Sequence, residues 1–310
     1  MVITALLAPL LAASAPLAEA PAAFFQPELS PEARTVFEAR DAVPPEETRA
    51  ALEALARDGD ASALELLGEL HMFGRGTMGK DVARACDYFE QVGDRRADSL
   101  HNLASCYWTG DGRAQDHAKA RALYLKAAEA GWRMSFCAYG KMLVEGQGGP
   151  ADPEEGLRLC RMTALLGDKD ALTDYGIYLL NGTGTERDPA TARFMLERAA
   201  EQGQASAAFL LGQIHIKGDG TPVSPKAAGE WFAKAYDAGR RDAASKAAAS
   251  FLRYGYTRLD NGNMQIRPTY LREARNWYGK ALADLEPGSE RHQEIAKLIP
   301  LIDRLLESED

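Results

Sequence analysis

Residues 170–203 read DALTDYGIYLLNGTGTERDPATARFMLERAAEQG, and this stretch decides the fold. From Leu172 to Leu179 its apolar residues stand three or four positions apart, which is the spacing of one face of an α-helix. Two glycines then break the helix, because glycine alone adopts positive φ without steric cost. Asp188 and Pro189 start a second helix, since a carboxylate caps free backbone N–H groups and proline fits the first turn. The stretch therefore predicts a helical hairpin.

The same pattern recurs every 36 residues. A pair of glycines follows each first helix, and a small residue stands at one fixed position inside it. A period of this size indicates a repeat array, in which each hairpin buries its apolar face against the next one. The glycine pairs are Gly74 and Gly76, Gly110 and Gly112, Gly146 and Gly148, Gly182 and Gly184, and Gly218 and Gly220; the small residues are Gly68, Ala104, Gly140, Gly176 and Gly212.

We predict an all-α protein, an α-solenoid that winds as a right-handed superhelix of antiparallel helix pairs with a 36-residue period. Near residues 92–97 we expect an irregularity, because Arg96 replaces the glycine that ends other second helices. The closing helix should kink or split at Pro300. The predicted parts are a capping helix at 46–60, repeats at about 61–96, 97–132, 133–168, 169–204 and 205–240, a degenerate repeat at 241–285 with a longer loop from Tyr254 to Pro268, and a capping helix at 289–307.

Length and charge narrow the class of protein. A chain of 310 residues suggests two domains, but the period makes residues 46–310 one elongated domain. Thirty-six Lys and Arg against 45 Asp and Glu give a net charge of −9, which disfavours binding to nucleic acid. His71 and His215 occupy a position that holds Tyr or Leu in other repeats, so we expect them to pack rather than to bind metal. We predict no catalytic group, no metal and no cofactor.

The sequence of the N-terminus has the pattern of an export signal. Val2 to Ala13 is an apolar run too short to cross a bilayer, and small residues at signal-peptidase spacing follow it. We predict a signal peptide over residues 1–22 and a flexible segment over 23–45, and no later stretch is apolar enough to span a membrane. The run is preceded by no Lys or Arg, so an N-terminal anchor and a disordered Ala/Pro leader remain alternatives.

The four cysteines fall into two pairs. Cys86 and Cys106 lie about equally far from one predicted turn, and Cys137 and Cys160 lie about equally far from another. Each pair can face across an antiparallel hairpin, and an exported chain meets oxidising conditions that favour disulfides. Buried free thiols are the alternative, because other repeats fill two of these positions with Leu, Met, Tyr or Phe.

The repeat pattern A-x-x-L-G-x-x-(Tyr/Leu)-x-x-G-x-G, followed by D-x-x-x-A, a bulky pair and A-A-x-x-G, resembles the Sel-one-like repeat family, a relative of the tetratricopeptide repeat. It is fullest in residues 170–203 and 205–239 and extends over about 61–240. The resemblance implies a non-enzymatic adaptor. Cysteine-rich secreted members of the family carry cysteines once per repeat near the end of the second helix, and this chain does not.

By analogy with tetratricopeptide arrays, first-helix positions flanking the small residue should line a concave groove. These positions share no chemistry from repeat to repeat, as expected of a groove shaped for one heterogeneous partner. Ile177 and Phe209 are its apolar members and predicted anchors, and His101 and Lys141 are polar members. Trp132 stands where other repeats have Asp, Gln or Arg, so it either contacts a partner or covers the irregular junction.

We predict an exported scaffold, periplasmic or secreted in a bacterial envelope, that binds a protein on this groove. The resemblance implies that the partner is the periplasmic domain of a sensor or an envelope complex, in a role of envelope signalling or assembly. The alternative is an enzyme or binder acting on cell-wall material, since some family members are reported as penicillin-binding, β-lactamase-like hydrolases.

Overall fold

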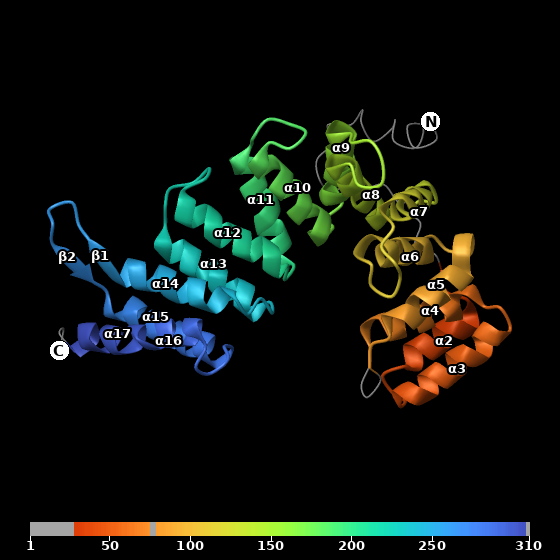
Figure 1. The fold of residues 1–310 in the computed structure, drawn as a ribbon, viewed down its shortest axis with the longest axis horizontal. Coiled ribbons are helices and arrows are strands. Elements are labelled where there is room, and N and C mark those ends of the chain that lie inside the picture. Colours follow the sequence, from red (N-terminus) through yellow and green to blue (C-terminus); the bar gives the residue numbers. More distant parts are fainter. Residues whose placement is uncertain (1–27, 75–78, 308–310) are drawn as a thin grey trace. The chain divides into compact units, whose positions relative to one another are not determined.

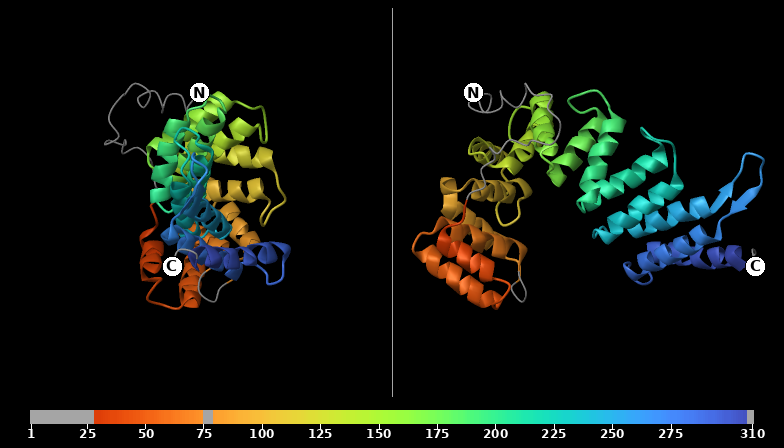
Figure 2. Two further views of the ribbon diagram at one scale, coloured as in Figure 1. Left: turned by 90° about the vertical axis from the view of Figure 1, so that its left-hand side faces the viewer. Right: turned by 180° about the vertical axis from the view of Figure 1, so that it is seen from behind.

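The computed structural model describes residues 28–74 and 79–307, which form two compact units, one ending at Leu166 and the other beginning at Gly167. Each unit is an all-α solenoid of consecutive antiparallel helix pairs (Figure 1), and Figure 2 shows the same pairs from two further sides. The predicted signal peptide, residues 1–22, lies outside the described residues. The continuity of the solenoid across the unit boundary and its superhelical hand stay predictions.

In the first unit, each repeat contributes one hairpin. The predicted irregularity is confirmed: α5 ends at Val92, and a 3₁₀ helix, η1 (Gly93–Arg95), leads into the next repeat. The hairpins are α2 (Pro31–Ala39) with α3 (Pro45–Arg57), α4 (Ala61–Phe73) with α5 (Val82–Val92), α6 (Ala97–Thr109) with α7 (His117–Glu129), and α8 (Arg133–Glu145) with α9 (Pro153–Leu165).

The second unit continues the same pattern, with one departure. The long loop of the degenerate repeat forms a small antiparallel β-hairpin, in which Tyr256 pairs with Ile266. The helices and strands are α10 (Lys169–Asn181), α11 (Pro189–Glu201), α12 (Ala205–Lys217), α13 (Pro225–Asp237), α14 (Ala243–Gly255), β1 (Tyr256–Arg258), β2 (Met264–Ile266), α15 (Pro268–Ala283), α16 (Glu290–Ala296) and α17 (Leu298–Glu307).

The capping residues place the helix ends as the sequence predicts. Asp188 Oδ1 accepts a hydrogen bond from the Thr191 N–H at 3.0 Å, and Pro189 occupies the first turn of α11. Asp116 caps α7 in the same way without a proline, at 2.9 Å from the Lys119 N–H. Such a cap contributes about 1 kcal/mol. Each first helix therefore ends, and each second helix begins, at nearly the same place in every repeat.

Small residues inside the first helices allow the two helices of a hairpin to approach closely. A Cβ atom added at Gly212 would lie 2.6 Å from the Phe232 ring, so the ring fills the space that a side chain would take. In the hairpin of α8 and α9, a Cβ at Gly140 would lie 2.6 Å from the carbonyl oxygen of Gly156. That contact involves backbone on both sides, so side-chain rotation cannot relieve it.

Residues 28–45, the described part of the segment predicted to be flexible over 23–45, contain the helix α2 and so differ from that prediction. Ser30 Oγ accepts a hydrogen bond from the Ala33 N–H at 3.2 Å, and Pro31 starts α2. Ala33 is fully buried in a core cluster with residues of α3 and α4, which fixes α2 in place. Ser30 and Pro31 start the helix and the burial of Ala33 holds it, so this segment is helical rather than flexible. The N-terminal cap is a complete hairpin rather than the lone helix predicted over 46–60.

The closing helix is split, as predicted, but three residues before Pro300. α16 ends at Ala296 and α17 begins at Leu298, with Lys297 between them. A proline ring clashes with the carbonyl group four residues earlier, which here belongs to Ala296. The break at Lys297 therefore lies directly after the residue whose carbonyl group the ring blocks. None of the helices in the described ranges is long and apolar enough to cross a membrane.

Gly140→Ala tests the close approach of α8 and α9. We expect it to lower the free energy of unfolding by about 1–3 kcal/mol, because the added methyl group meets the Gly156 carbonyl and must push the helices apart. Urea denaturation followed by circular dichroism measures the change. Gly279→Ala in α15 is the control: its added Cβ has no atom within 4 Å, and alanine favours a helix by up to about 1 kcal/mol. Equal stability of Gly140→Ala and wild type would contradict the packing described.

Candidate functional site

In the first unit, buried polar side chains join the neighbouring first helices α4 and α6. Glu65 on α4 is 2% exposed. Its carboxyl group accepts a hydrogen bond from the Ser99 hydroxyl and another from Asn102 Nδ2, at 2.8 Å, both on α6. Arg96 lies beside them and forms an ion pair with Asp98 at 2.6 Å. This part of the predicted groove is closed by the chain's own side chains.

The Glu65 carboxyl is an uncharged acid at neutral pH. Burial raises its pKa to about 8, and the negative charges of Asp98 and Glu69 add to the effect. Burial and Asp98 also raise the pKa of Glu69, against the opposing charge of Arg96. Glu65 therefore acts as a hydrogen-bonding residue of the α4–α6 contact, and the prediction of groove residues did not include it.

His101 packs between α6 and its neighbours rather than standing free. Its Nδ1 lies 2.8 Å from the Ser135 hydroxyl on α8, and its ring meets the Tyr124 ring edge-on at 5.1 Å between centroids. Burial lowers the pKa of His101 to about 4, so the ring is neutral at pH 7. His101 consequently connects α6 to α8.

Lys141 lies near the end of α8 and Trp132 directly before its first residue. The Lys141 ammonium group stands 5.3 Å from the centroid of the Trp108 ring. Trp108 Nε1 donates a hydrogen bond to Gln147 Oε1 at 2.6 Å, which holds the indole between the helices. Trp132 precedes α8 and is half-buried, and its Nε1 has no hydrogen-bond partner within the described ranges.

Ile177 borders an open space in the second unit. A cavity of about 410 Å³ lies between the first helices α10 and α12, and Ile177 forms part of its wall. The predicted groove is hollow at this place.

Phe209 is a core residue, which corrects its assignment as an exposed anchor. Its side chain is 5% exposed, and its ring meets Phe232 edge-on at 5.2 Å. The Arg240 guanidinium group covers the ring at 3.6 Å from its centroid. A cation held over an aromatic face is a favourable contact that also shields the ring from solvent. The repeat pattern placed Phe209 on the right face of α12, but Arg240, which follows α13 at the end of the same repeat, covers it.

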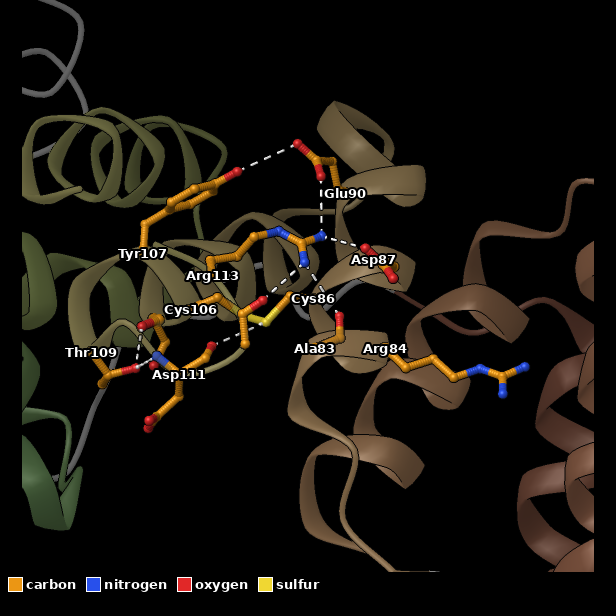
Figure 3. The surroundings of a disulfide bond; sticks show 12 residues. Ala83, Arg84, Cys86, Asp87, Glu90, Cys106, Tyr107, Thr109, Asp111 and Arg113 are labelled. Carbon is orange, nitrogen blue, oxygen red and sulfur yellow. Dashed lines mark hydrogen bonds and ion pairs between the residues drawn. A yellow bond between two sulfur atoms is a disulfide. The ribbon is translucent and has the colours of Figure 1, made fainter. Parts of the chain in front are cut away.

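A disulfide joins the first and second repeats. Cys86 on α5 is bonded to Cys106 on α6 (Figure 3). Beside it, Arg113 reaches back from the loop after α6 and forms ion pairs with Asp87 at 2.6 Å and Glu90 at 3.2 Å on α5. This junction is thus held by one covalent bond and a cluster of charges.

A second disulfide joins Cys137 on α8 to Cys160 on α9, within the third repeat. Both bonds follow the pairings considered from the sequence, and in the structure none of the four cysteines is a free thiol. The helices face each other closely at this bond because glycines occupy both sides of the α8–α9 contact.

The described part of the chain contains no group of three or more His, Cys, Asp and Glu side chains arranged to hold a metal ion. His71 stacks on Tyr88 at 5.6 Å between ring centroids, so it packs against its neighbour helix. The groups that border the cavity between α10 and α12 are aliphatic side chains, amides and charges.

Comparison with known proteins places these features in a family. The family model described as Sel1 repeat matches five segments of the chain. No curated protein matches it. The matched segments are residues 61–92, 97–132, 137–168, 169–204 and 205–239.

Two solved structures share the fold. A Sel1 repeat protein from Oxalobacter formigenes has 24% sequence identity and a TM-score of 0.63, and the match covers 84% of this chain and 99% of that one. A protective antigen present in uropathogenic Escherichia coli strains, described as displaying an SLR fold, has 25% identity and a TM-score of 0.59 over 76% of this chain. This chain covers 48% of that antigen, about half of its length.

Glu65→Gln tests the uncharged carboxyl. Because the pKa of Glu65 is about 8 in the folded chain and about 4.5 when exposed, the folded state holds the extra proton between these values. The free energy of unfolding of the wild type should therefore fall by about 2–3 kcal/mol from pH 6 to pH 9. Glu65→Gln does not titrate, so it should lack that loss; its amide oxygen can still accept from Asn102 Nδ2, and its NH2 group can donate to the Ser99 oxygen.

Glu129→Gln, an exposed position on α7, serves as the matched control and should keep the pH dependence of the wild type. Urea denaturation at a series of pH values gives the comparison. An identical slope for wild type and Glu65→Gln between pH 6 and pH 9 would show that Glu65 is ionised in the folded protein.

Intact-mass measurement tests the two disulfides. Under denaturing conditions we expect the unreduced protein to take up no iodoacetamide and the reduced protein to take up four groups. The bonds join cysteines 20 and 23 residues apart, and loops of this length contribute about 3 kcal/mol each, so reduction should also lower the Tm. A double Cys137→Ala, Cys160→Ala variant should take up two groups after reduction. Alkylation of the unreduced wild type would refute the bonded state.

Proposed function

Because this chain belongs to the Sel1 repeat family, whose members are generally protein-interaction scaffolds, we propose that it is an exported scaffold that binds a protein partner on the faces of its first helices. The observation that carries the proposal is the open cavity between α10 and α12. In the first unit, Glu65 bonds across the α4–α6 face and Trp108 bonds to Gln147 across the α6–α8 face. The face between α10 and α12 instead leaves apolar surface for another molecule to cover.

The binding residues proposed on this basis are those of the predicted set that lie on or beside first-helix faces. Ile177 is the central one, because it lines the cavity. His101 and Lys141 take part in contacts between α6 and α8, and together with Trp132, at the start of α8, they are proposed as a secondary surface. Phe209 is left out, because its ring is buried beneath Arg240.

The proposed location is the periplasm or the outside of a bacterial cell, and the proposed partner is the periplasmic domain of a sensor or an envelope complex. Two features support export: the apolar run from Val2 to Ala13, and the two disulfides, which persist in oxidising compartments. The proposed role is binding without a chemical step, at an open space bordered by aliphatic and amide groups together with Arg187, Lys217 and Asp219.

Cross-linking in the bacterial envelope followed by affinity purification tests the scaffold. We expect wild type to capture a defined partner and Ile177→Glu to lose at least nine-tenths of it, because a carboxylate would then stand in the apolar wall. Phe194→Glu is the control: it makes the same kind of change at a 47% exposed side chain on the second helix α11.

Equal capture by wild type and Ile177→Glu, with both proteins folded by circular dichroism, would remove the first-helix face from the proposal. Incubation with a labelled penicillin separates binding from the cell-wall enzyme alternative. We expect no covalent adduct, and a stoichiometric adduct would refute the scaffold-only function.

A further inference from the structure

The cavity between α10 and α12 has an aliphatic wall. Ile177 and Leu180 line it from α10, and Leu210 and Ile214 line it from α12. The first three are partly exposed and Ile214 is buried. Its volume of about 410 Å³ lies within the range of sites that bind small molecules or a few residues of a peptide.

The repeat period shows why this site is open. The space between α6 and α8 is the equivalent, two repeats earlier, of the space between α10 and α12. In it, Trp108 takes the position of Leu180, and Lys141 takes the position of Gln213. There the Trp108 indole fills the gap, held by Gln147 and faced by Lys141. Leucine at position 180 leaves that volume empty. The same scaffold is therefore closed by a tryptophan in one unit and open in the other.

The edge of the cavity is polar and carries one unmatched positive charge. Arg187 and Asp219 pair with each other, with Arg187 Nη2 at 2.8 and 3.0 Å from the two carboxylate oxygens. Lys217 is exposed and has no ion-pair partner among residues 28–74 and 79–307. The side-chain amides of Asn181 and Gln213 likewise have no hydrogen-bond partner within those ranges. The site thus offers one cation and two amides beside an apolar wall.

We propose that this cavity binds an extended peptide segment of the protein partner in which an aliphatic side chain stands next to a carboxylate. The proposal rests on the scaffold function and names the chemistry of its partner. The aliphatic side chain is buried against Ile177 and Leu180. An amide group carries both a donor and an acceptor, as a peptide bond does, so Asn181 and Gln213 match the partner's backbone. Lys217 pairs with the carboxylate, so the cavity prefers a negatively charged segment to a neutral one.

Fluorescence anisotropy with labelled hexapeptides tests the chemistry directly on the full chain. The probes are Gly-Ser-Leu-Glu-Ser-Gly, its Leu-Gln form without the charge, and its Ser-Glu form without the aliphatic side chain. We expect the Leu-Glu peptide to bind at least tenfold more tightly than either of the other two. Added salt should lower the affinity for the Leu-Glu peptide more than the affinity for the Leu-Gln peptide, because only the Leu-Glu peptide forms the ion pair.

Two variants locate the binding. Lys217→Glu should reduce the affinity for the Leu-Glu peptide at least tenfold and remove the preference over Leu-Gln. Leu180→Trp copies the closed repeat and should reduce binding of both leucine peptides. Lys246→Glu on α14 makes the same charge change at an exposed lysine away from the cavity and should bind as wild type does. Thermal melts confirm that each variant is folded.

Equal affinity for the three peptides, or full affinity in Lys217→Glu, would overturn the inference. Preferential binding of labelled octanoate over every peptide would overturn it as well, in favour of a small amphiphile. The scaffold function is tested separately by the envelope cross-linking. If no captured partner depends on Ile177, the scaffold function is refuted. If a captured partner does depend on Ile177 but the peptides bind with equal affinity, only the peptide assignment is refuted.

Discussion

Each repeat of this protein depends on the near absence of a side chain at one position of its first helix. A ring or an aliphatic side chain of the second helix occupies that space, as Phe232 does over Gly212, or two backbones meet there, as at Gly140 and Gly156. Close-packed interiors do not accept even one extra methyl group without moving their neighbours. The 36-residue period is thus the spacing at which this contact must recur, and the capping residues and turn glycines keep each hairpin in register with it.

Once the hairpin core is fixed in this way, the faces between successive first helices are free to differ. In the first unit they are filled by the chain itself: Glu65 bonds to Ser99 and Asn102, and Trp108 bonds to Gln147. Disulfides reinforce the same unit at two places. In the second unit the face between α10 and α12 stays hollow. The hollow face between α10 and α12 is where we place the main recognition surface.

The sequence predicted the features that obey the period and missed those that depend on contacts between repeats. Helix starts such as Asp188 followed Asp-Pro and Ser-Pro signals, because capping is local chemistry. α2 was missed because it lacks the repeat's glycines, although Ser30 and Pro31 carry the start signal. Phe209 was placed on the correct helix face, but Phe232 and Arg240, later in the same repeat, cover its ring, and no local pattern encodes these contacts. The cavity at Ile177 likewise exists because residue 180 is smaller than its counterpart Trp108, a difference between repeats rather than a motif.

Site-specific photo-cross-linking in the bacterial envelope tests the central claim most directly. A photoreactive phenylalanine analogue is placed at position 177, in the cavity between α10 and α12, or at position 194, on the exposed face of α11. The account predicts a discrete protein adduct from position 177 and none from position 194. An adduct from position 194 alone would contradict it, since the partner would then bind the second helices and the hollow face would have no part in recognition.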